Sequence, residues 1–283
     1  MPMKVVSLDK TRDIFQLRRD QATGLEAVGA RFHSHAYDMH FHDEWLVGVT
    51  HHGVQDFFCR GQRRQSTTGK IMLIEPGELH DGQAIRDDGF TYSMLYLPQS
   101  LLKQEMGGSD AAIGFRSTVT DDPRLASAIA RTSSLILDAA PRLSIEERRD
   151  EIITLLCNHL GRDAPKTRLI SSETSERAME YLRAHFEEDI GLEQLVEAVG
   201  ASDRFALSRS FRRRYGTSLH ACLVQLRLAA ARRLLREQET PAQAAMLSGF
   251  ADQSHMGRWF RRTYGLTPAQ YRRGRTNVPD LAR

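Results

Sequence analysis

The chain has 283 residues, of which 41% are hydrophobic and 27% are charged. That length suits two ordinary domains, and that composition excludes a disordered or fibrous protein. No apolar run approaches the roughly 20 residues that span a bilayer, and the N-terminus lacks the apolar core of a signal peptide. We therefore expect a cytoplasmic protein with no membrane partner. Three widely spaced cysteines, Cys59, Cys157 and Cys222, predict neither a disulfide framework nor a zinc site.

Basic residues are concentrated in the second half of the chain. Met1 to Asp163 holds 19 basic and 23 acidic residues, whereas Gly200 to Arg275 holds 15 basic and four acidic residues. The second segment therefore carries a net charge of +11 in 76 residues. Such asymmetry favours a polyanionic partner, although a charge run by itself is also typical of a solvated surface.

Short runs with strand character extend from about Arg31 to Pro98. β-Branched and aromatic residues recur there between Gly and Pro residues that mark turns, in runs such as VQDFFCR, IMLI and FTYSMLYLP. This pattern is typical of an antiparallel sandwich or barrel.

After Pro98 the strand signals end and helical patterns begin. Residues 121–140 form the first predicted helix, with an Asp cap and a proline in the first turn. Residues 144–162 form the second, in which Ser144 and Glu147 match a capping box. The polar stretch RDAPKTR at 162–168 suits a linker, and the chain beyond it is expected to be helical.

The C-terminal part contains an internal repeat. Residues 194–218 align without a gap on residues 243–267 and are identical at nine of 25 positions. The repeat includes the phrases FRRRYGTS at Phe211 and FRRTYGLT at Phe260. This degree of identity indicates a duplicated structural unit.

Each copy has the layout of a helix-turn-helix unit. In the first copy, residues 191–199 form a short helix and residues 202–215 form a second one. Gly200 makes the turn between them, where a positive φ costs little, and Gly249 takes the same place in the second copy. The spacing predicts two buried pairs on the second helices, Leu207 with Phe211 and Met256 with Phe260.

A long helix over residues 218–237 is predicted between the two copies. Its 20 residues measure about 30 Å at the usual helix rise. Successive major grooves lie about 34 Å apart on one face of a duplex, so the two units can enter both. We therefore interpret the repeat as two units that read two half-sites of double-stranded DNA.

The outward faces of the two second helices carry side chains that suit DNA contacts. Arg and Gln form bidentate contacts with guanine and adenine edges, while Ser and His give single contacts or bind phosphate. For Arg209 and Arg258 a base contact stays open beside two other roles, a phosphate clamp and a structural ion pair. Phe205 is either a base contact or a partly exposed packing residue. The predicted DNA-binding residues are Arg204, Phe205, Ser208, Arg209, Arg212, Gln253, Ser254, His255, Arg258 and Arg261.

The C-terminal residues resemble a known family. The segment GFADQSHMGRWFRRTYGLTPAQYRR at 249–273 is similar to the signature of AraC/XylS-type transcription regulators, and the resemblance covers about Thr174 to Arg273. It implies two helix-turn-helix units joined by a long helix in a DNA-binding regulator. It also implies a homodimer formed through the helices at about 121–162, and RNA polymerase as a partner if the protein is an activator.

The N-terminal segment resembles the cupin-like sensor domain that many members of this family carry. The residues that carry the resemblance are His40-Phe41-His42 and the PGELH motif that ends at His80. Alternate residues of a strand share a face, so His40, His42 and Glu44 are predicted to point together into the barrel, close to His80. Tyr92, Met94 and Tyr96 alternate on another strand, where they either line the same cavity or pack in the core. The predicted effector-binding residues are His40, His42, Glu44, His80, Tyr92 and Tyr96.

Three interpretations of the histidine cluster stay open. It is the polar pocket of a small organic effector, a metal site of three imidazoles and one carboxylate, or a hydrogen-bonded structural cluster. The cupin metal pattern places its glutamate further along the chain, at about Leu46 or Val47, and neither residue can coordinate an ion. We adopt the effector pocket, with no metal and no cofactor.

The sequence thus predicts an α+β protein of two domains, with a cupin-like antiparallel β-barrel, a following helical pair and an all-α double helix-turn-helix domain. The predicted bounds are 1–105 for the sensing domain, 106–165 for the helical linker or dimerisation region, and 166–283 for the DNA-binding domain, with its units at about 190–216 and 240–265.

The predicted function is sequence-specific transcription regulation controlled by a small effector. No phosphate loop or nucleophile motif supports an enzyme. The alternatives are a metal-dependent cupin enzyme with an accessory helical nucleic-acid-binding domain, and a protein that binds nucleic acid without specificity.

Overall fold

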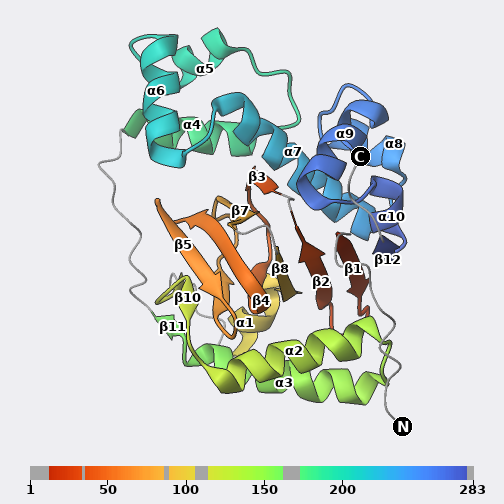
Figure 1. The fold of residues 1–283 in the computed structure, drawn as a ribbon. Coiled ribbons are helices and arrows are strands. Elements are labelled where there is room, and N and C mark those ends of the chain that lie inside the picture. Colours follow the sequence, from red (N-terminus) through yellow and green to blue (C-terminus); the bar gives the residue numbers. More distant parts are fainter. Residues whose placement is uncertain (1–12, 34–35, 86–88, 106–113, 162–172, 279–283) are drawn as a thin grey trace.

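The structure is a computed structural model that describes residues 13–33, 36–85, 89–105, 114–161 and 173–278. Figure 1 shows a region of β-strands with two long helices beneath it and a group of helices above it and to its right. The predicted linker at residues 162–168 lies outside the described residues. None of the described helices combines the length and the apolar character that are needed to cross a membrane.

The N-terminal region is built from antiparallel strands, as the sequence predicts. The strands with their bounds are β1 (Ile14–Arg19), β2 (Glu26–Phe32), β3 (Ala36–His40), β4 (Trp45–Cys59), β5 (Gln62–Thr67), β6 (Ile71–Ile74), β7 (His80–Ala84), β8 (Phe90–Leu97), β9 (Gly114–Phe115), β10 (Val119–Thr120), β11 (Leu160–Gly161) and β12 (Arg275–Val278).

The long strand β4 links two groups of strands. Its first part, up to Gly53, pairs with β6 and β8, and its second part, from Val54, pairs with β5 and β7. The pairing with β8 shifts register between Thr50 and His52, where a bulge bends the strand. β7 also pairs with β3. His40 at the end of β3 and His80 at the start of β7 therefore meet beside the second part of β4.

The predicted barrel does not close within the described part of the chain. The strand order is β10-β6-β4-β8-β2-β1-β12, with β3, β5 and β7 paired alongside. The end strand β12 comes from the C-terminal segment, which the sequence analysis expects to be helical, and its backbone pairs with β1. β12 covers the edge of β1, whose backbone N–H and C=O groups would otherwise have no strand partner on that side. The edge is therefore protected without closure of the barrel. β1 and β2 lie before the predicted strand region, which begins at about Arg31.

Two helices lie across the sheet. They are α2 (Pro123–Leu137) and α3 (Arg142–Cys157), and the short α1 (Gln99–Glu105) precedes them. Asp122 caps α2 as predicted by accepting hydrogen bonds from two backbone N–H groups of the first turn. The capping box predicted at Ser144 is wrong, because α3 begins two residues earlier, directly after Pro141, whose fixed φ suits a helix start.

The C-terminal domain is helical up to residue 272. Its helices are α4 (Glu173–Ala184), α5 (Leu192–Val199), α6 (Arg204–Tyr215), α7 (Leu219–Arg236), α8 (Pro241–Leu247), α9 (Gln253–Tyr264) and α10 (Pro268–Arg272). The two helix-turn-helix units and the long helix between them are therefore present, as the repeat predicts. α7 has 18 residues, or about 27 Å at the usual helix rise.

The two domains share one hydrophobic core. Phe32 and Tyr92 of the sheet belong to the same buried cluster as Leu228 of α7 and Phe260 of α9. A second cluster holds α2 and α3 against the opposite side of the strands, through residues such as Ile129. The connecting helix α7 is therefore packed against the sheet rather than held away from it.

Candidate functional site

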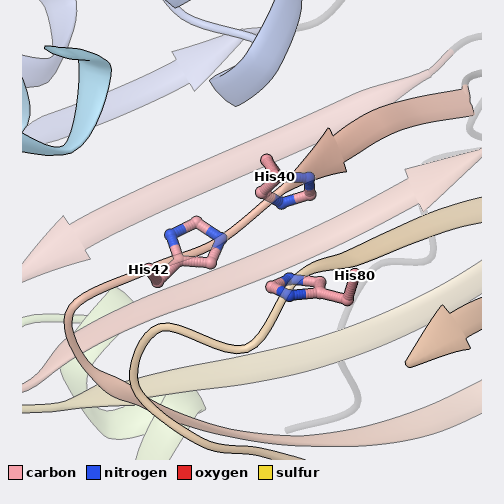
Figure 2. Close-up of side chains that lie close together, drawn as sticks. All are labelled: His40, His42 and His80. Atoms are coloured by element: carbon pink, nitrogen blue, oxygen red, sulfur yellow. The ribbon is translucent and has the colours of Figure 1, made fainter. Parts of the chain in front are cut away.

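Three histidines meet between the end of β3 and the start of β7. Figure 2 shows the rings of His40, His42 and His80 gathered there. The ring centroid of His40 lies 4.9 Å from that of His42 and 4.4 Å from that of His80, and the centroids of His42 and His80 lie 5.3 Å apart. All three side chains are buried. Each offers a nitrogen atom, and these atoms lie within 4.8 Å of one another.

Strand register, rather than strand alternation, brings the histidines together. His40 is the cross-strand partner of His80 in the pairing of β3 with β7. β3 ends at His40, so His42 and Glu44 do not lie on a strand, although the sequence analysis places them on one. The carboxylate of Glu44 is not part of the histidine cluster and instead contacts two arginines of α7.

Hydrogen bonds define the proton position on each ring. The Nδ1 atom of His40 lies 2.6 Å from the carbonyl oxygen of Asp38, and that of His80 lies 2.8 Å from the carbonyl oxygen of Glu78. A carbonyl oxygen only accepts, so both Nδ1 atoms carry the proton and both lone pairs are on Nε2. The ring of His42 has the opposite arrangement, with the lone pair on Nδ1, because this atom lies 3.2 Å from Nη1 of Arg232, which only donates. A neutral His42 therefore carries its proton on Nε2.

Burial keeps the rings of His42 and His80 neutral. It lowers the pKa of His80 to about 3, and the neighbouring His40 contributes in the same direction. Burial also holds the pKa of His42 well below its usual value, with further contributions from His40 and Arg232. Rings without charge at neutral pH can act as hydrogen-bond acceptors or as metal ligands.

An arginine of the connecting helix lies beside the histidines. Nη2 of Arg232 donates to Glu26 of β2 at 2.6 Å, and Nη1 donates to Glu44 at 2.8 Å. Arg236, one turn later on α7, pairs with the other oxygen of Glu44 at 2.7 Å. The hydroxyl of Tyr271 donates to Glu26 at 3.0 Å. These contacts join the sheet to three positions of the helical domain.

The ion pair between Arg232 and Glu26 stays charged in spite of burial. Burial favours the neutral form of Arg232, but the carboxylate of Glu44, the ring of Tyr271 and the carboxylate of Glu26 raise its pKa well above the ordinary value. Burial likewise raises the pKa of Glu26, but Arg232 and Arg19 outweigh it, so the pKa is lowered. No sequence signal identifies this pair, because the partners are 206 residues apart and each is an ordinary charged residue of a helix or strand.

A narrow cavity runs through this cluster. The space open to the centre of a water molecule is about 50 Å³, which holds about four water molecules at the usual ~10–15 Å³ each. His40, His42 and His80 line it, and Glu44 does not. The other residues of the sheet that line it include Glu26, Tyr37, Phe57, Tyr92, Met94 and Tyr96, and those of the helical domain are Arg232, Thr263, Tyr264, Leu266 and Tyr271.

The tyrosines of β8 lie where the sequence analysis places them. Tyr92, Met94 and Tyr96 alternate along the strand and face the cavity. The hydroxyl of Tyr92 lies 3.2 Å from that of Tyr37, and the ring of Tyr96 lies 4.7 Å from the guanidinium carbon of Arg232. Burial raises the pKa of Tyr92 to about 12. These phenols are therefore neutral donors at the cavity wall.

The turns of the two helix-turn-helix units have the predicted geometry. Gly200 has a φ of 63° and Gly249 a φ of 78°, both in the left-handed region. A Cβ atom at Gly249 would also lie 2.7 Å from the backbone oxygen of Glu187, so only glycine fits. Asp203 caps the N-terminus of α6 and Asp252 caps that of α9, each by accepting hydrogen bonds from backbone N–H groups of the first turn.

The outward faces of α6 and α9 are mostly exposed. The buried pairs are those that the sequence predicts, Leu207 with Phe211 and Met256 with Phe260. Phe205 is exposed by 61%, which is unusual for a large apolar side chain and argues against a packing role. The predicted contact residues that are exposed are Arg204, Phe205, Ser208, Arg209, Arg212, Gln253, Ser254, Arg258 and Arg261.

Several basic side chains of these helices have partners within the protein. His255 is half-buried, and its Nε2 accepts a hydrogen bond of 3.1 Å from Trp259. Arg204 lies 3.3 Å from Glu193 in an exposed ion pair. Arg262 of α9, which is exposed, pairs with Asp38 of β3. This last contact ties the second unit to the strand that carries His40.

Two stretches of the chain match known families. Residues 23–154 match the AraC-like ligand binding domain, and residues 195–274 match a helix-turn-helix domain. The first range covers the strands from β2 to β10 and most of the helical pair, and the second covers most of α5 and the helices from α6 to α10.

Curated relatives match along most of the chain. The uncharacterized HTH-type transcriptional regulator YbfI of Bacillus subtilis is 27% identical over 248 residues, which are 85% of this chain and 88% of the relative. The HTH-type transcriptional activator RhaS of Escherichia fergusonii is 25% identical over 264 residues, which are 88% of this chain and 92% of the relative.

Solved structures show the same fold at low identity. The structure of ToxT from Vibrio cholerae has a TM-score of 0.52 and 14% identity, and the match covers 89% of this chain and 99% of ToxT. The structure of unsaturated fatty acid bound wild-type ToxT gives a TM-score of 0.52 and 12% identity, covering 93% and 95% of the two chains. With both of its domains matched in this order, the chain belongs to the AraC family of DNA-binding transcription regulators and carries an N-terminal ligand-binding domain.

Proposed function

We propose that a small effector binds in the cavity beside His42 and changes how the helical domain meets its operator. The observation that carries this proposal is the shared wall of the cavity, to which the sheet and the helical domain both contribute side chains. Arg232 of α7 is central to it, because it contacts Glu26, Glu44 and His42 at once. A ligand there touches the DNA-binding domain directly.

The size of the cavity supports a mechanical link. An organic ligand usually needs several hundred Å³, far more than the space for about four water molecules that this cavity offers. Entry of such a molecule must therefore displace part of the wall. The walls contributed by the helical domain, at Arg232, Tyr264 and Tyr271, contact Glu26 and His42 of the N-terminal domain. Displacing them shifts the helix that joins the two DNA-binding units.

We assign effector contacts to the side chains that line this cavity. His40, His42 and His80 supply polar nitrogen atoms, and Tyr92 and Tyr96 supply hydroxyl groups. The carboxylate of Glu44 acts through Arg232 and Arg236 instead of meeting the ligand. ToxT with an unsaturated fatty acid is a related fold with an organic ligand, which favours an organic molecule here too.

We assign base and phosphate contacts to the exposed faces of α6 and α9. Arg204, Arg209 and Arg212 project from the first unit, and Gln253 with Arg258 from the second. The length of α7 suits half-sites separated by about one helical turn of DNA. His255 makes at most one further contact through Nδ1, because its Nε2 accepts from Trp259.

The domain bounds that we propose are 1–105, 106–165 and 166–283. A dimer through the helical pair would need the outer face of α3, because its apolar stripe, which includes Ile152 and Leu156, packs in the core of its own chain. RNA polymerase is a partner if the protein activates transcription. DNA as a partner also favours a cytoplasmic location.

Selection of duplexes from a random library by the full chain tests the DNA function. We expect enrichment of two short blocks about 10 base pairs apart. An operator obtained in this way then serves in a screen of small organic compounds for a change in affinity. Equal binding of all duplexes at one salt concentration would contradict sequence-specific regulation, and unchanged operator affinity across a broad screen would contradict effector control.

A further inference from the structure

The three imidazoles are spaced as they are around a metal ion. A histidine nitrogen binds Zn²⁺ at ~2.0–2.1 Å, which puts each ring centre about 3.2 Å from the ion and two ring centres about 4.5–5.3 Å apart. The centroids of His40, His42 and His80 are separated by 4.4, 4.9 and 5.3 Å. Their nitrogen atoms lie within 4.8 Å of one another, and binding of one ion brings them to about 3.4 Å.

Two of the rings are already oriented as metal ligands. The hydrogen bonds from Nδ1 of His40 to the carbonyl of Asp38 and from Nδ1 of His80 to the carbonyl of Glu78 fix the ring planes. Ligating histidines typically donate the second ring N–H to a carbonyl in this way, and the bond directs the Nε2 lone pair at the ion. Both carbonyls belong to the residue two positions before the histidine, so the local backbone sets the geometry.

The third ring is held in the opposite state. Nδ1 of His42 accepts from Arg232, so its Nε2 carries the proton and presents no lone pair. Binding through Nε2 moves the proton to Nδ1, where it meets the N–H of Arg232 at 3.2 Å and repels it. Binding through Nδ1 takes the lone pair that accepts from Nη1 of Arg232. Either route ends the contact between His42 and Arg232.

We propose that His40, His42 and His80 together bind one divalent first-row transition ion, such as Zn²⁺, Co²⁺ or Ni²⁺, and that this ion and the His42–Arg232 hydrogen bond exclude each other. Three imidazoles suit these ions and leave a coordination position for water or a ligand atom. Arg232 keeps its bonds to Glu26 and Glu44, so the ion loosens the contact between the domains without removing it. The metal site stands by itself, whereas an effect on DNA rests on the proposed function.

Titration of the full chain with Co²⁺, followed by visible absorption, tests the site. We expect one ion per chain, with the spectrum of a nitrogen-ligated site and competition by Zn²⁺. His40→Gln and His80→Gln should weaken binding at least tenfold, whereas His220→Gln, at an exposed position of α7, should not. Unchanged Co²⁺ affinity in folded His80→Gln protein would overturn the proposal.

A measurement on the wild-type chain removes the dependence on variants. Long-range ¹H–¹⁵N spectra of the histidine rings report which nitrogen carries the proton. Without metal, we expect the proton of His42 on Nε2, and with Zn²⁺ we expect Nε2 or Nδ1 to become the metal-bound nitrogen and the contact to Arg232 to disappear. A ring of His42 that keeps its proton on Nε2 and its contact to Arg232 at saturating Zn²⁺ would refute the coupling.

Arg232→Lys separates the metal site from its consequence. One ammonium group cannot reach Glu26, Glu44 and His42 from the same position, so we expect the variant to bind Co²⁺ about fivefold more tightly or better. In the wild type, Zn²⁺ should change operator affinity by a similar factor. If Zn²⁺ binds without changing operator affinity, the proposed link between the ion and Arg232 is wrong but the metal site stands. If the protein binds its operator but binds no metal, the metal site is wrong and the proposed function is unaffected.

Discussion

Arg232 of the connecting helix donates a hydrogen bond of 2.6 Å to Glu26 of the second strand, although the two residues are 206 positions apart. Their side chains are exposed by only 5% and 4%. The pair therefore places a charge of the DNA-binding domain inside the ligand-binding domain. Because α7 joins both helix-turn-helix units, a change at Glu26 or in the adjoining cavity reaches both units through one helix.

Removing Arg232 should destabilise the protein strongly. Arg232→Met keeps much of the side-chain volume but leaves Glu26 and Glu44 buried without their partner, and such changes cost about 3–5 kcal/mol. The free energy of unfolding in urea measures the effect. Arg233→Met, at the exposed neighbouring position, is the matched control and should change stability by less than about 0.5 kcal/mol. Equal effects of the two substitutions would show that the buried pair contributes nothing.

Stability should fall in mildly acidic solution because of His80. The pKa of this ring is about 3 in the folded chain and about 6.5 when unfolded. Above pH 6.5 both states are neutral and stability does not depend on this group. Between these pH values only the unfolded chain takes up the proton. Each decrease of one pH unit therefore lowers the free energy of unfolding by about 1.4 kcal/mol.

The comparison of wild type with His80→Gln isolates this contribution. Urea unfolding at a series of pH values, with a chelator present, should give a shallower pH dependence for the variant. His220→Gln, at an exposed site, should follow the wild type. Parallel curves for wild type and His80→Gln would mean that the ring titrates alike in both states.

The turn glycine of the second unit should not tolerate a side chain. Gly249→Ala introduces a methyl group at a φ of 78° and 2.7 Å from the backbone oxygen of Glu187. We expect a loss of more than about 1 kcal/mol in the free energy of unfolding. Gly257→Ala is the control, because its Cβ position in α9 meets nothing within 4 Å, and it should be neutral or stabilising by up to about 1 kcal/mol. A larger loss for Gly257→Ala than for Gly249→Ala would contradict this account of the turn.

The exposed residues of α9 should separate into base and phosphate contacts. Gln253→Ala and Arg258→Ala should each cost about 1–3 kcal/mol on the selected operator and relax the preference at one base pair. Arg261→Ala should weaken binding to all duplexes and lower the salt slope by about one. Arg63→Ala, at an exposed position of β5 in the other domain, is the control and should leave DNA affinity unchanged. Loss of affinity without any change in base preference for Gln253→Ala and Arg258→Ala would assign both to the phosphate backbone.

The sequence determined the local features of the helical domain. The repeat located both helix-turn-helix units, since Gly200 and Gly249 have the positive φ that a tight turn requires and the apolar pairs at a spacing of one turn face the core. These features depend on neighbouring residues only, so periodicity and turn chemistry reveal them. The histidine motifs likewise indicated which residues lie at the site.

How the parts of the molecule meet depends on contacts between residues far apart in the chain. The register of β3 against β7 paired His40 with His80, and a break in the strand after His40 turned Glu44 toward α7. The strand at 275–278 returns to cover β1, where sequence analysis expects helix. Above all, Arg232 became part of the cavity wall because packing of α7 on the sheet buried it between two carboxylates. A charged residue on a helix looks the same in the sequence whether it meets water or a buried partner, since the partner is chosen by contacts far along the chain.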